Sequence, residues 1–210
     1  MPEEGPSSDR IITIYGTSML KNSGTGTLHF TNTGTFCSAG VQACRLVLDG
    51  EGDGIIDGAV NPGDCGWIEK RGTGTWTLTS SASVYDYPAK VLAGTLRVTG
   101  ALPGGAVVEE GATLAFGEGA LVKRHLESRG TIRYEVDADA VEHAPVTVWG
   151  TIALGGDLQI AGHLHESTTI LTAENGVTGE FASIPESVVV RVVGNDVIID
   201  PALPTAILFR

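Results

Sequence analysis

Apolar and polar residues alternate in short runs along most of the chain, and many of these runs begin with the same motif. A Gly/Ala-Thr-apolar triplet opens five of them: GTWTL at 74–78, GTLRV at 94–98, ATLAF at 112–116, GTIRY at 130–134 and GTIAL at 150–154. The steps between their threonines are 20, 18, 18 and 20 residues. Near-constant spacing of this kind is the signature of a repeat architecture.

Each run has the period-two pattern of a β-strand, with side chains pointing alternately to opposite faces. When the five runs are aligned in register, two of the strand positions form apolar columns. The position between these columns holds residues that are compatible with solvent. The first column is Trp76, Leu96, Leu114, Ile132 and Ile152, and the second is Leu78, Val98, Phe116, Tyr134 and Leu154. The set between them is Thr77, Arg97, Ala115, Arg133 and Ala153. Stacked coils would bury both columns.

The predicted fold is all-β: a right-handed parallel β-helix, or β-solenoid, with coils of about 18–20 residues. Turns separate the strands at 99–105, 117–119, 155–156 and 174–176. Upstream, GTLHF at 26–30 and RLVLDG at 45–50 are expected to supply two further rungs. About eight coils would give a rod of about 40 Å. A β-sandwich or jelly roll is the alternative, but it does not require constant steps.

We predict three regions: a polar N-terminal arm over 1–10, one β-helix domain over 11–200, and a C-terminal tail or cap over 201–210. The open ends of a solenoid are unpaired strand edges, so a cap or partner is needed there. The N-terminal arm and the sequence PALPTAILFR are the candidates for this role.

Composition narrows the possible partners. The chain has 210 residues, 29 of them glycine, and a formal net charge of −12, which disfavours nucleic acids and anionic bilayers. No apolar run approaches the roughly 20 residues that a membrane span needs, so no membrane insertion by this segment is expected. The start, MPEEGPSSDR, lacks the regions of a secretory signal. We therefore expect either a cytosolic protein or a piece of an exported precursor.

Residues 46–102 contain LVLDGEGDGIIDG, IEKRGTGTWTLTS and VLAGTLRVTGAL, in that order. This order resembles the autotransporter-associated β-strand repeat of bacterial autotransporter passenger domains, with its K-x-G-x-G-T-L-T-L motif. Residues 170–201 are similar to the C-terminal end of such passengers. The family's translocator barrel is absent from this sequence, and three cysteines are more than such passengers usually carry. The resemblance implies export from a longer precursor to the bacterial cell surface.

The cysteines are Cys37, Cys44 and Cys65. Cys37 and Cys44 bracket a short loop that a disulfide could close, and two loosely buried thiols are the alternative. None forms a CxxC or His-paired pattern, so a zinc site is not predicted.

The acidic stretch DGEGDGIIDG places Asp49, Glu51, Asp53 and Asp57 at spacings found in calcium loops. Val60 occupies the position of the bidentate glutamate, and no helices flank the loop. We predict a structural turn, and a weak Ca²⁺ site is the alternative.

Other possible sites are predicted to be solvated surface. Asp137 and Asp139 could share one side of an extended segment, Glu109 and Glu110 form a pair on a turn, and His163 and His165 could share a strand face. The glycine-rich EKRGTGTWTLTS at 69–80 could be a phosphate loop, but its repetition favours a strand. No catalytic, cofactor-binding or metal-binding residue is predicted, and no cofactor.

The predicted function is that of a non-enzymatic, extracellular passenger or stalk segment in adhesion or surface display. Its exposed faces would bind a host cell, a glycan or another copy of itself, and not nucleic acid. Two alternatives remain: a carbohydrate-active β-helix, either a polysaccharide lyase or a hydrolase, and a self-assembling structural solenoid.

Overall fold

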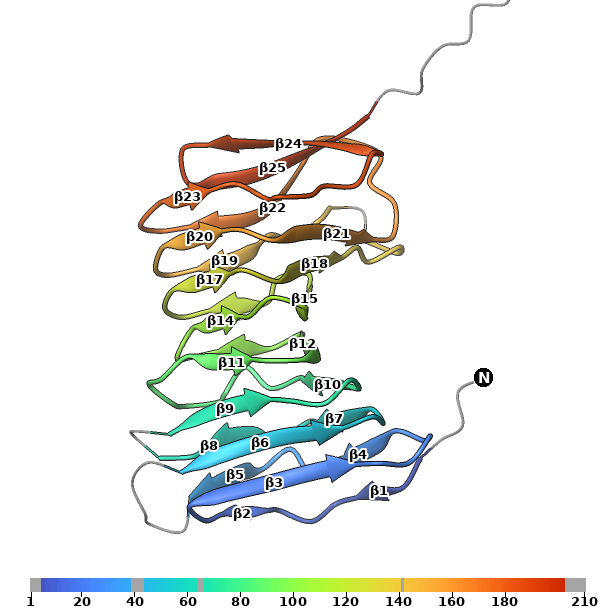
Figure 1. Cartoon of the computed structure of the whole chain (residues 1–210), viewed down its shortest axis with the longest axis vertical. Coiled ribbons are helices and arrows are strands. Elements are labelled where there is room, and N and C mark those ends of the chain that lie inside the picture. Colours follow the sequence, from blue (N-terminus) through green and yellow to red (C-terminus); the bar gives the residue numbers. More distant parts are fainter. Residues whose placement is uncertain (1–4, 39–43, 64–65, 141, 203–210) are drawn as a thin grey trace, which may run out of the picture.

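The computed structural model describes residues 5–38, 44–63, 66–140 and 142–202. Within these ranges every regular element is a β-strand, and there is no helix. The strands lie in coils stacked along one axis, so that segments 20 or so residues apart are neighbours (Figure 1).

One side of the stack, sheet I, has eight strands, and all of its pairings are parallel. Its strands, in spatial order, are β1 (Ser7–Ser8), β4 (Leu28–Phe30), β7 (Gly54–Ile56), β10 (Thr75–Leu78), β12 (Gly94–Val98), β15 (Ala112–Gly117), β18 (Thr131–Glu135) and β21 (Asp157–Ala161).

A second side, sheet II, also has eight parallel strands. They are β3 (Thr17–Asn22), β6 (Arg45–Gly50), β9 (Trp67–Lys70), β11 (Ala89–Val91), β14 (Ala106–Val108), β17 (Leu126–Ser128), β20 (Ile152–Leu154) and β23 (Val177–Gly179).

The third side is divided between two smaller sheets. Sheet IV, in the N-terminal part, contains β2 (Thr13–Ile14), β5 (Thr35–Ser38) and β8 (Ala59–Asn61). Sheet III, in the C-terminal part, contains β13 (Ala101–Leu102), β16 (Leu121–Val122), β19 (Val146–Val148), β22 (Thr168–Ala173), β25 (Asp196–Pro201) and β24 (Val188–Val193).

Along the chain each coil visits sheet II, then sheet I, then the third side. The run β14, β15, β16 is one such coil, and β17 then pairs with β14 to begin the next. Eight strands in sheet I correspond to about seven complete turns. The predicted parallel β-solenoid is therefore confirmed, with a coil number close to the expected value.

The predicted register is confirmed through the middle of sheet I. Thr75 pairs with Thr95, Thr95 with Thr113, and Thr113 with Thr131. Both predicted columns are buried over these four rungs: Trp76, Leu96, Leu114, Ile132, Leu78, Val98, Phe116 and Tyr134. The prediction that the residues between them are solvent-compatible is wrong for Thr77 and Ala115, which are also buried.

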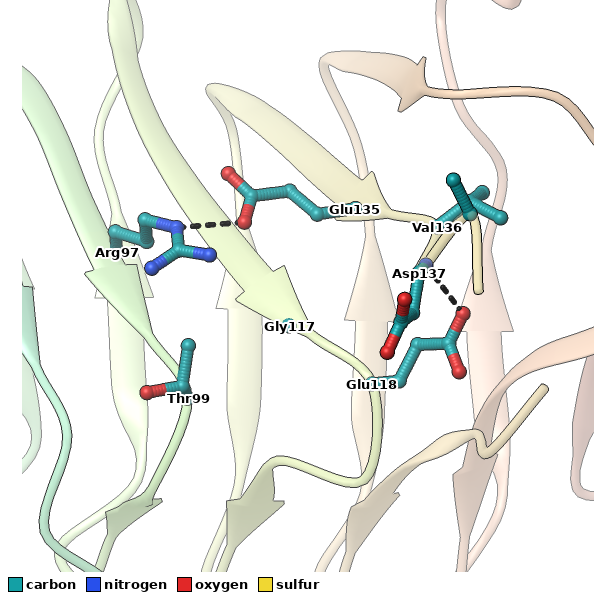
Figure 2. Close-up of a pocket in the computed structure, with 8 residues that line it drawn as sticks. Arg97, Thr99, Gly117, Glu118, Glu135, Val136 and Asp137 are labelled. Atoms are coloured by element: carbon teal, nitrogen blue, oxygen red, sulfur yellow. Dashed lines mark hydrogen bonds and ion pairs between the residues drawn. The ribbon is translucent and has the colours of Figure 1, made fainter. Parts of the chain in front are cut away.

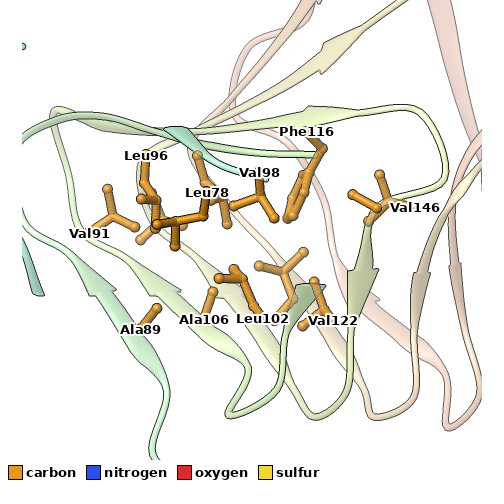
Figure 3. Close-up of a cluster of buried hydrophobic side chains, with 14 of the residues drawn as sticks. Leu78, Ala89, Val91, Leu96, Val98, Leu102, Ala106, Phe116, Val122 and Val146 are labelled. Carbon is orange, nitrogen blue, oxygen red and sulfur yellow. The ribbon is translucent and has the colours of Figure 1, made fainter. Parts of the chain in front are cut away.

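Figure 3 shows how the three sides fill one core in the middle of the stack. Leu78, Leu96, Val98 and Phe116 enter it from sheet I, and Val91 and Ala106 from sheet II. The third side contributes Leu102, Val122 and Val146. Residues of different coils thus pack on one another, and no coil buries its apolar side chains alone.

The predicted position of GTIAL is wrong. Its strand, β20, lies in sheet II, where Ile152 pairs with Leu126. Sheet I continues instead with β21, whose Asp157 pairs with Thr131, a step of 26 residues. The connection from β18 to β19 covers residues 136–145, whereas β15 to β16 needs 118–120. Because this connection is longer, the triplet falls one side earlier in the coil, in sheet II, and Leu158 of β21 continues the buried column of sheet I.

RLVLDG is also predicted to be a rung of the same sheet as the GTWTL strand, sheet I, and this prediction is wrong. It forms β6 of sheet II, pairing with β3 and β9. The rung of sheet I between β4 and β10 is β7, in which Gly54 pairs with Leu28 and Trp76. Gly54 leaves room for the Trp76 ring, because a Cβ atom there would lie 2.4 Å from its Cε3.

Chain direction reverses at the C-terminal end. Strand β25 runs antiparallel to β22, and β24 runs antiparallel to β25. The last coil therefore ends in a hairpin whose outer strand, β24, is the edge of sheet III.

Candidate ligand-binding site

The corner between sheets II and I contains EKRGTGT, the candidate phosphate loop. Lys70 is fully buried there, and its ammonium donates to the carbonyls of Gly72 at 2.9 Å, Ala93 at 3.1 Å and Arg71. Burial lowers the pKa of Lys70 to about 8, opposed by the negative charges of Asp49 and Asp53. The lysine is thus occupied by backbone carbonyls of its own corner, which is a structural role.

The glycines of this corner stack on those of the neighbouring coils. Gly50, Gly72 and Gly94 have positive φ angles of 109°, 65° and 62°. A Cβ atom on Gly72 would lie 2.4 Å from Gly50 O, and one on Gly94 would lie 2.4 Å from Gly72 O. The Gly74 amide already donates to Gly50 O at 3.0 Å. The GTGT run is therefore part of a tight, glycine-rich corner that recurs in three neighbouring coils.

The structure disperses the four carboxylates of the candidate calcium loop. Asp49 accepts the amide of Gly50 at 2.8 Å, and Asp53 accepts that of Thr75 at 2.7 Å. Asp57 pairs with His29 at 2.7 Å. Among the described residues there is no group of three or more His, Cys, Asp or Glu that could hold a metal ion. Asp53 and Asp57 therefore hold neighbouring coils together, and Asp49 supports its own turn.

The proposed disulfide falls outside what the structure describes. Cys44 is buried. The Cys37 side chain and Cys65 are outside the described part, so the pairing of Cys37 with Cys44 stays a prediction.

The two predicted acidic pairs lie on turns. Asp137 and Asp139 do not share the side of an extended segment, because the Asp137 carboxylate accepts the Asp139 amide at 3.0 Å within a turn. Glu109 pairs with Arg129 at 3.1 Å on the surface, and Glu110 is exposed beside it. Neither pair is arranged as two facing carboxylates.

The histidine pair is also separate from any cluster. His163 and His165 are exposed and lie in the loop that follows β21, not on a strand. The other three histidines each have a side-chain partner: His29 pairs with Asp57 at 2.7 Å, His125 contacts Thr151 at 2.8 Å, and His143 pairs with Glu118 at 2.7 Å.

His143 and Glu118 lead to a cavity of about 420 Å³ beside sheet I (Figure 2). It lies where β15 and β18 end and the long connection to β19 begins. Its lining residues come from three successive coils: Arg97, Thr99, Gly117, Glu118, Glu135, Val136, Asp137 and Ala138.

Three carboxylates line this cavity, and each has a partner. Glu135 accepts from Arg97 at 2.6 Å. Glu118 accepts the Asp137 amide at 2.8 Å and the His143 Nδ1 hydrogen at 2.7 Å. Figure 2 shows the Arg97–Glu135 and Asp137–Glu118 contacts on opposite sides of the cavity.

The arrangement favours recognition over chemistry. A hydrolase needs one carboxyl that can release a proton and a second that is free to attack or to activate water. Glu118 and Glu135 are instead engaged by basic side chains. The cavity offers hydroxyl, guanidinium and carboxylate groups, which can hydrogen-bond a small polar ligand such as one sugar ring.

Sequence reasoning identified Asp137 but missed Glu118, Glu135 and His143. A partial signal existed: Gly117, which pairs with Glu135, lies in the recognised GEG turn. A Cβ atom at Gly117 would come within 2.9 Å of Thr99. The cavity depends on this missing side chain and on the coil-to-coil register, which local motifs do not specify.

No protein-family model matches the chain, and no curated protein matches its sequence. Among the described residues, no helix is long and apolar enough to cross a membrane.

Proposed function

We propose that this chain is a non-enzymatic passenger or stalk segment of an autotransporter-like bacterial surface protein. Its role would be adhesion or surface display outside the cell. The observation that carries the proposal is the ordered repeat at 46–102, with its lysine and glycine corner. Lys70, Gly72 and Gly74 of that motif form the turn on which neighbouring coils stack.

The proposed mechanism is mechanical. Stacked parallel coils make a stiff rod, since each strand is hydrogen-bonded to the coils before and after it. The outer faces and the turns at the corners then present side chains at regular intervals to a receptor or a glycan. The acidic surface, with a net charge of −12, keeps such a rod soluble and away from anionic membranes.

The test of location uses antibodies raised against the purified chain and applied to cells of the bacterium that produces it. We expect labelling of intact cells, at an intensity similar to that of permeabilised cells. Labelling restricted to permeabilised cells would contradict the proposal. An antibody against a cytoplasmic protein is the control for membrane integrity.

The test of adhesion uses beads coated with the purified chain on epithelial monolayers. We expect more bound beads than with Leu114→Asp, a variant whose net charge differs by one unit and whose core is disrupted, at a temperature where only the native chain is folded. Equal binding by beads coated with the native chain and with Leu114→Asp would show that the folded solenoid surface carries no adhesive function.

A carbohydrate-active enzyme is the second candidate, because Glu118 and Glu135 come from neighbouring coils and line one cavity. Its test is the release of reducing ends or unsaturated products from a panel of acidic and neutral polysaccharides. Under the leading proposal no product forms, and Glu135→Gln behaves as the native chain. Turnover that is lost in Glu135→Gln would establish the enzyme instead.

A further inference from the structure

The C-terminal end of the solenoid carries an apolar groove that the described part of the chain leaves uncovered. The groove has a volume of about 400 Å³ and lies between β24 and the segment that follows β23. Leu154, Phe181, Ile184, Val190 and Val192 line it. Ile184 and Val192 are 41% and 44% exposed, which is unusual for large aliphatic side chains in a packed coil.

Strand β24 adds a second unpaired feature at the same end. It is the edge of sheet III, with β25 on one side and no described strand on the other. Its sequence is VVVRVV, and Val189 and Val193 are each 51% exposed. An exposed, valine-rich edge strand is a site for strand addition and a hazard for aggregation.

We propose that residues 203–210 of the same chain, LPTAILFR, cover this groove and complete the end of the solenoid. The position of the preceding residue supports this occupant. Ala202 donates its amide to Ser187 O at 2.8 Å, beside the start of β24. The eight residues that follow can extend about 27 Å, more than the roughly 20 Å length of a six-residue strand.

The chemistry of the segment matches that of the groove. Ala206, Ile207, Leu208 and Phe209 form an apolar run in which Ile207 and Phe209 have high β-propensity, and Pro204 precedes this run in the sequence. Arg210 is the one charged side chain of the segment, and Glu180 is the one carboxylate that lines the groove. In an extended conformation Ile207 and Phe209 share a face, which can enter the groove together.

A second copy of the chain is the competing occupant. The attached segment has the advantage of effective concentration, because a short linker holds a docking segment at millimolar levels or above. Free copies in dilute solution do not reach such values.

The experiment uses the full chain and two single variants, Ile207→Asp and Phe209→Asp. Hydrogen exchange of the β24 amides, 188–193, is the main measurement, and binding of an apolar fluorescent dye is the second. We expect faster exchange in β24 and several-fold more dye binding in both variants. The control, Thr205→Asp, adds the same charge before the apolar run and should behave as the native chain.

The outcomes separate the possible occupants. Unchanged exchange and dye binding in both variants would overturn the proposal. A native chain whose mass rises with concentration, measured by light scattering, would also overturn it in favour of a second copy. A synthetic LPTAILFR peptide added to Phe209→Asp should restore protection of β24, which a general loss of folding would prevent.

Discussion

Arg97 and Glu135 form an ion pair at 2.6 Å, although a third strand lies between the two strands that carry them. Arg97 is in β12 and Glu135 ends β18, and β15 lies between them. Ala115 of β15 points outward between Arg97 and Arg133, yet it is completely buried. The pair therefore links alternate coils and covers the strand that separates them.

This pair should stabilise the rod modestly. Its side chains are 38% and 23% exposed, so solvent screens the attraction. We expect a coupling of about 0.5–1 kcal/mol in a double-mutant cycle of Arg97→Gln and Glu135→Gln, measured by urea unfolding. High salt should reduce it. A coupling of zero at low salt would show that the contact contributes nothing to stability.

The register predicts unequal costs for two neighbouring residues. Leu114 is fully buried between Leu96 and Ile132, whereas Thr113 is partly exposed. Leu114→Asp should lower the free energy of unfolding by about 4 kcal/mol or more, because it removes core volume and buries a charge. Thr113→Asp should cost about 1 kcal/mol or less. Circular dichroism during thermal unfolding distinguishes them, and equal damage would contradict the register.

The stacking of glycine corners predicts that alanine substitution costs more stability at one glycine than at another with a similar backbone angle. Gly72 and Gly111 have φ angles of 65° and 78°. A Cβ atom at Gly72 meets Gly50 O at 2.4 Å, whereas at Gly111 it meets nothing within 4 Å. Gly111→Ala should cost about 1 kcal/mol from backbone strain alone. Gly72→Ala should cost about 3 kcal/mol, since the coils must also separate. Similar losses in denaturant midpoint would refute the close stacking.

Lys70 predicts a pH dependence of stability. Its pKa is lowered from 10.5 to about 8 in the folded protein, chiefly by burial. Between these values the unfolded chain binds the proton and the folded one largely does not, so the free energy of unfolding rises with pH. We expect a gain of roughly 1–2 kcal/mol from pH 8 to pH 9.5.

The comparison for this effect is Lys70→Met, which cannot titrate. Its stability should lack the rise, although its absolute value is lower because the carbonyls of Gly72 and Ala93 lose their donor. Measurements stay below pH 10, because burial raises the pKa values of Tyr85 and Tyr134 and their contribution then has the opposite sign. Parallel curves for native chain and variant would contradict the assignment.

The sequence predicted the fold where coil length is nearly constant. From Thr75 to Thr131 the local period and the pairing register coincide, so alignment of the triplets gave the correct neighbours. It failed at Ile152, because the same triplet can open a strand on any side of the coil. The side is decided by the length of the preceding connection, which the triplet does not encode.

The candidate site was less predictable for a related reason. Glu118 and Glu135 are 17 residues apart, on a turn and at a strand end. Nothing in either local sequence distinguishes them from the other acidic residues. That both line one cavity depends on which coils stack, and on the absence of a side chain at Gly117, where a Cβ atom would press on Thr99.

The hairpin of β24 and β25 has a consequence for growth of the rod. A parallel coil extends a stack by offering its successor a strand of the same direction, and every coil from β1 to β23 does so. At β25 the direction is reversed, and β24, which is antiparallel to β25 and forms the edge of sheet III, runs in the common direction again. The last coil therefore holds one reversed strand inside sheet III, and the sheet still ends in a strand with which a further parallel strand could pair.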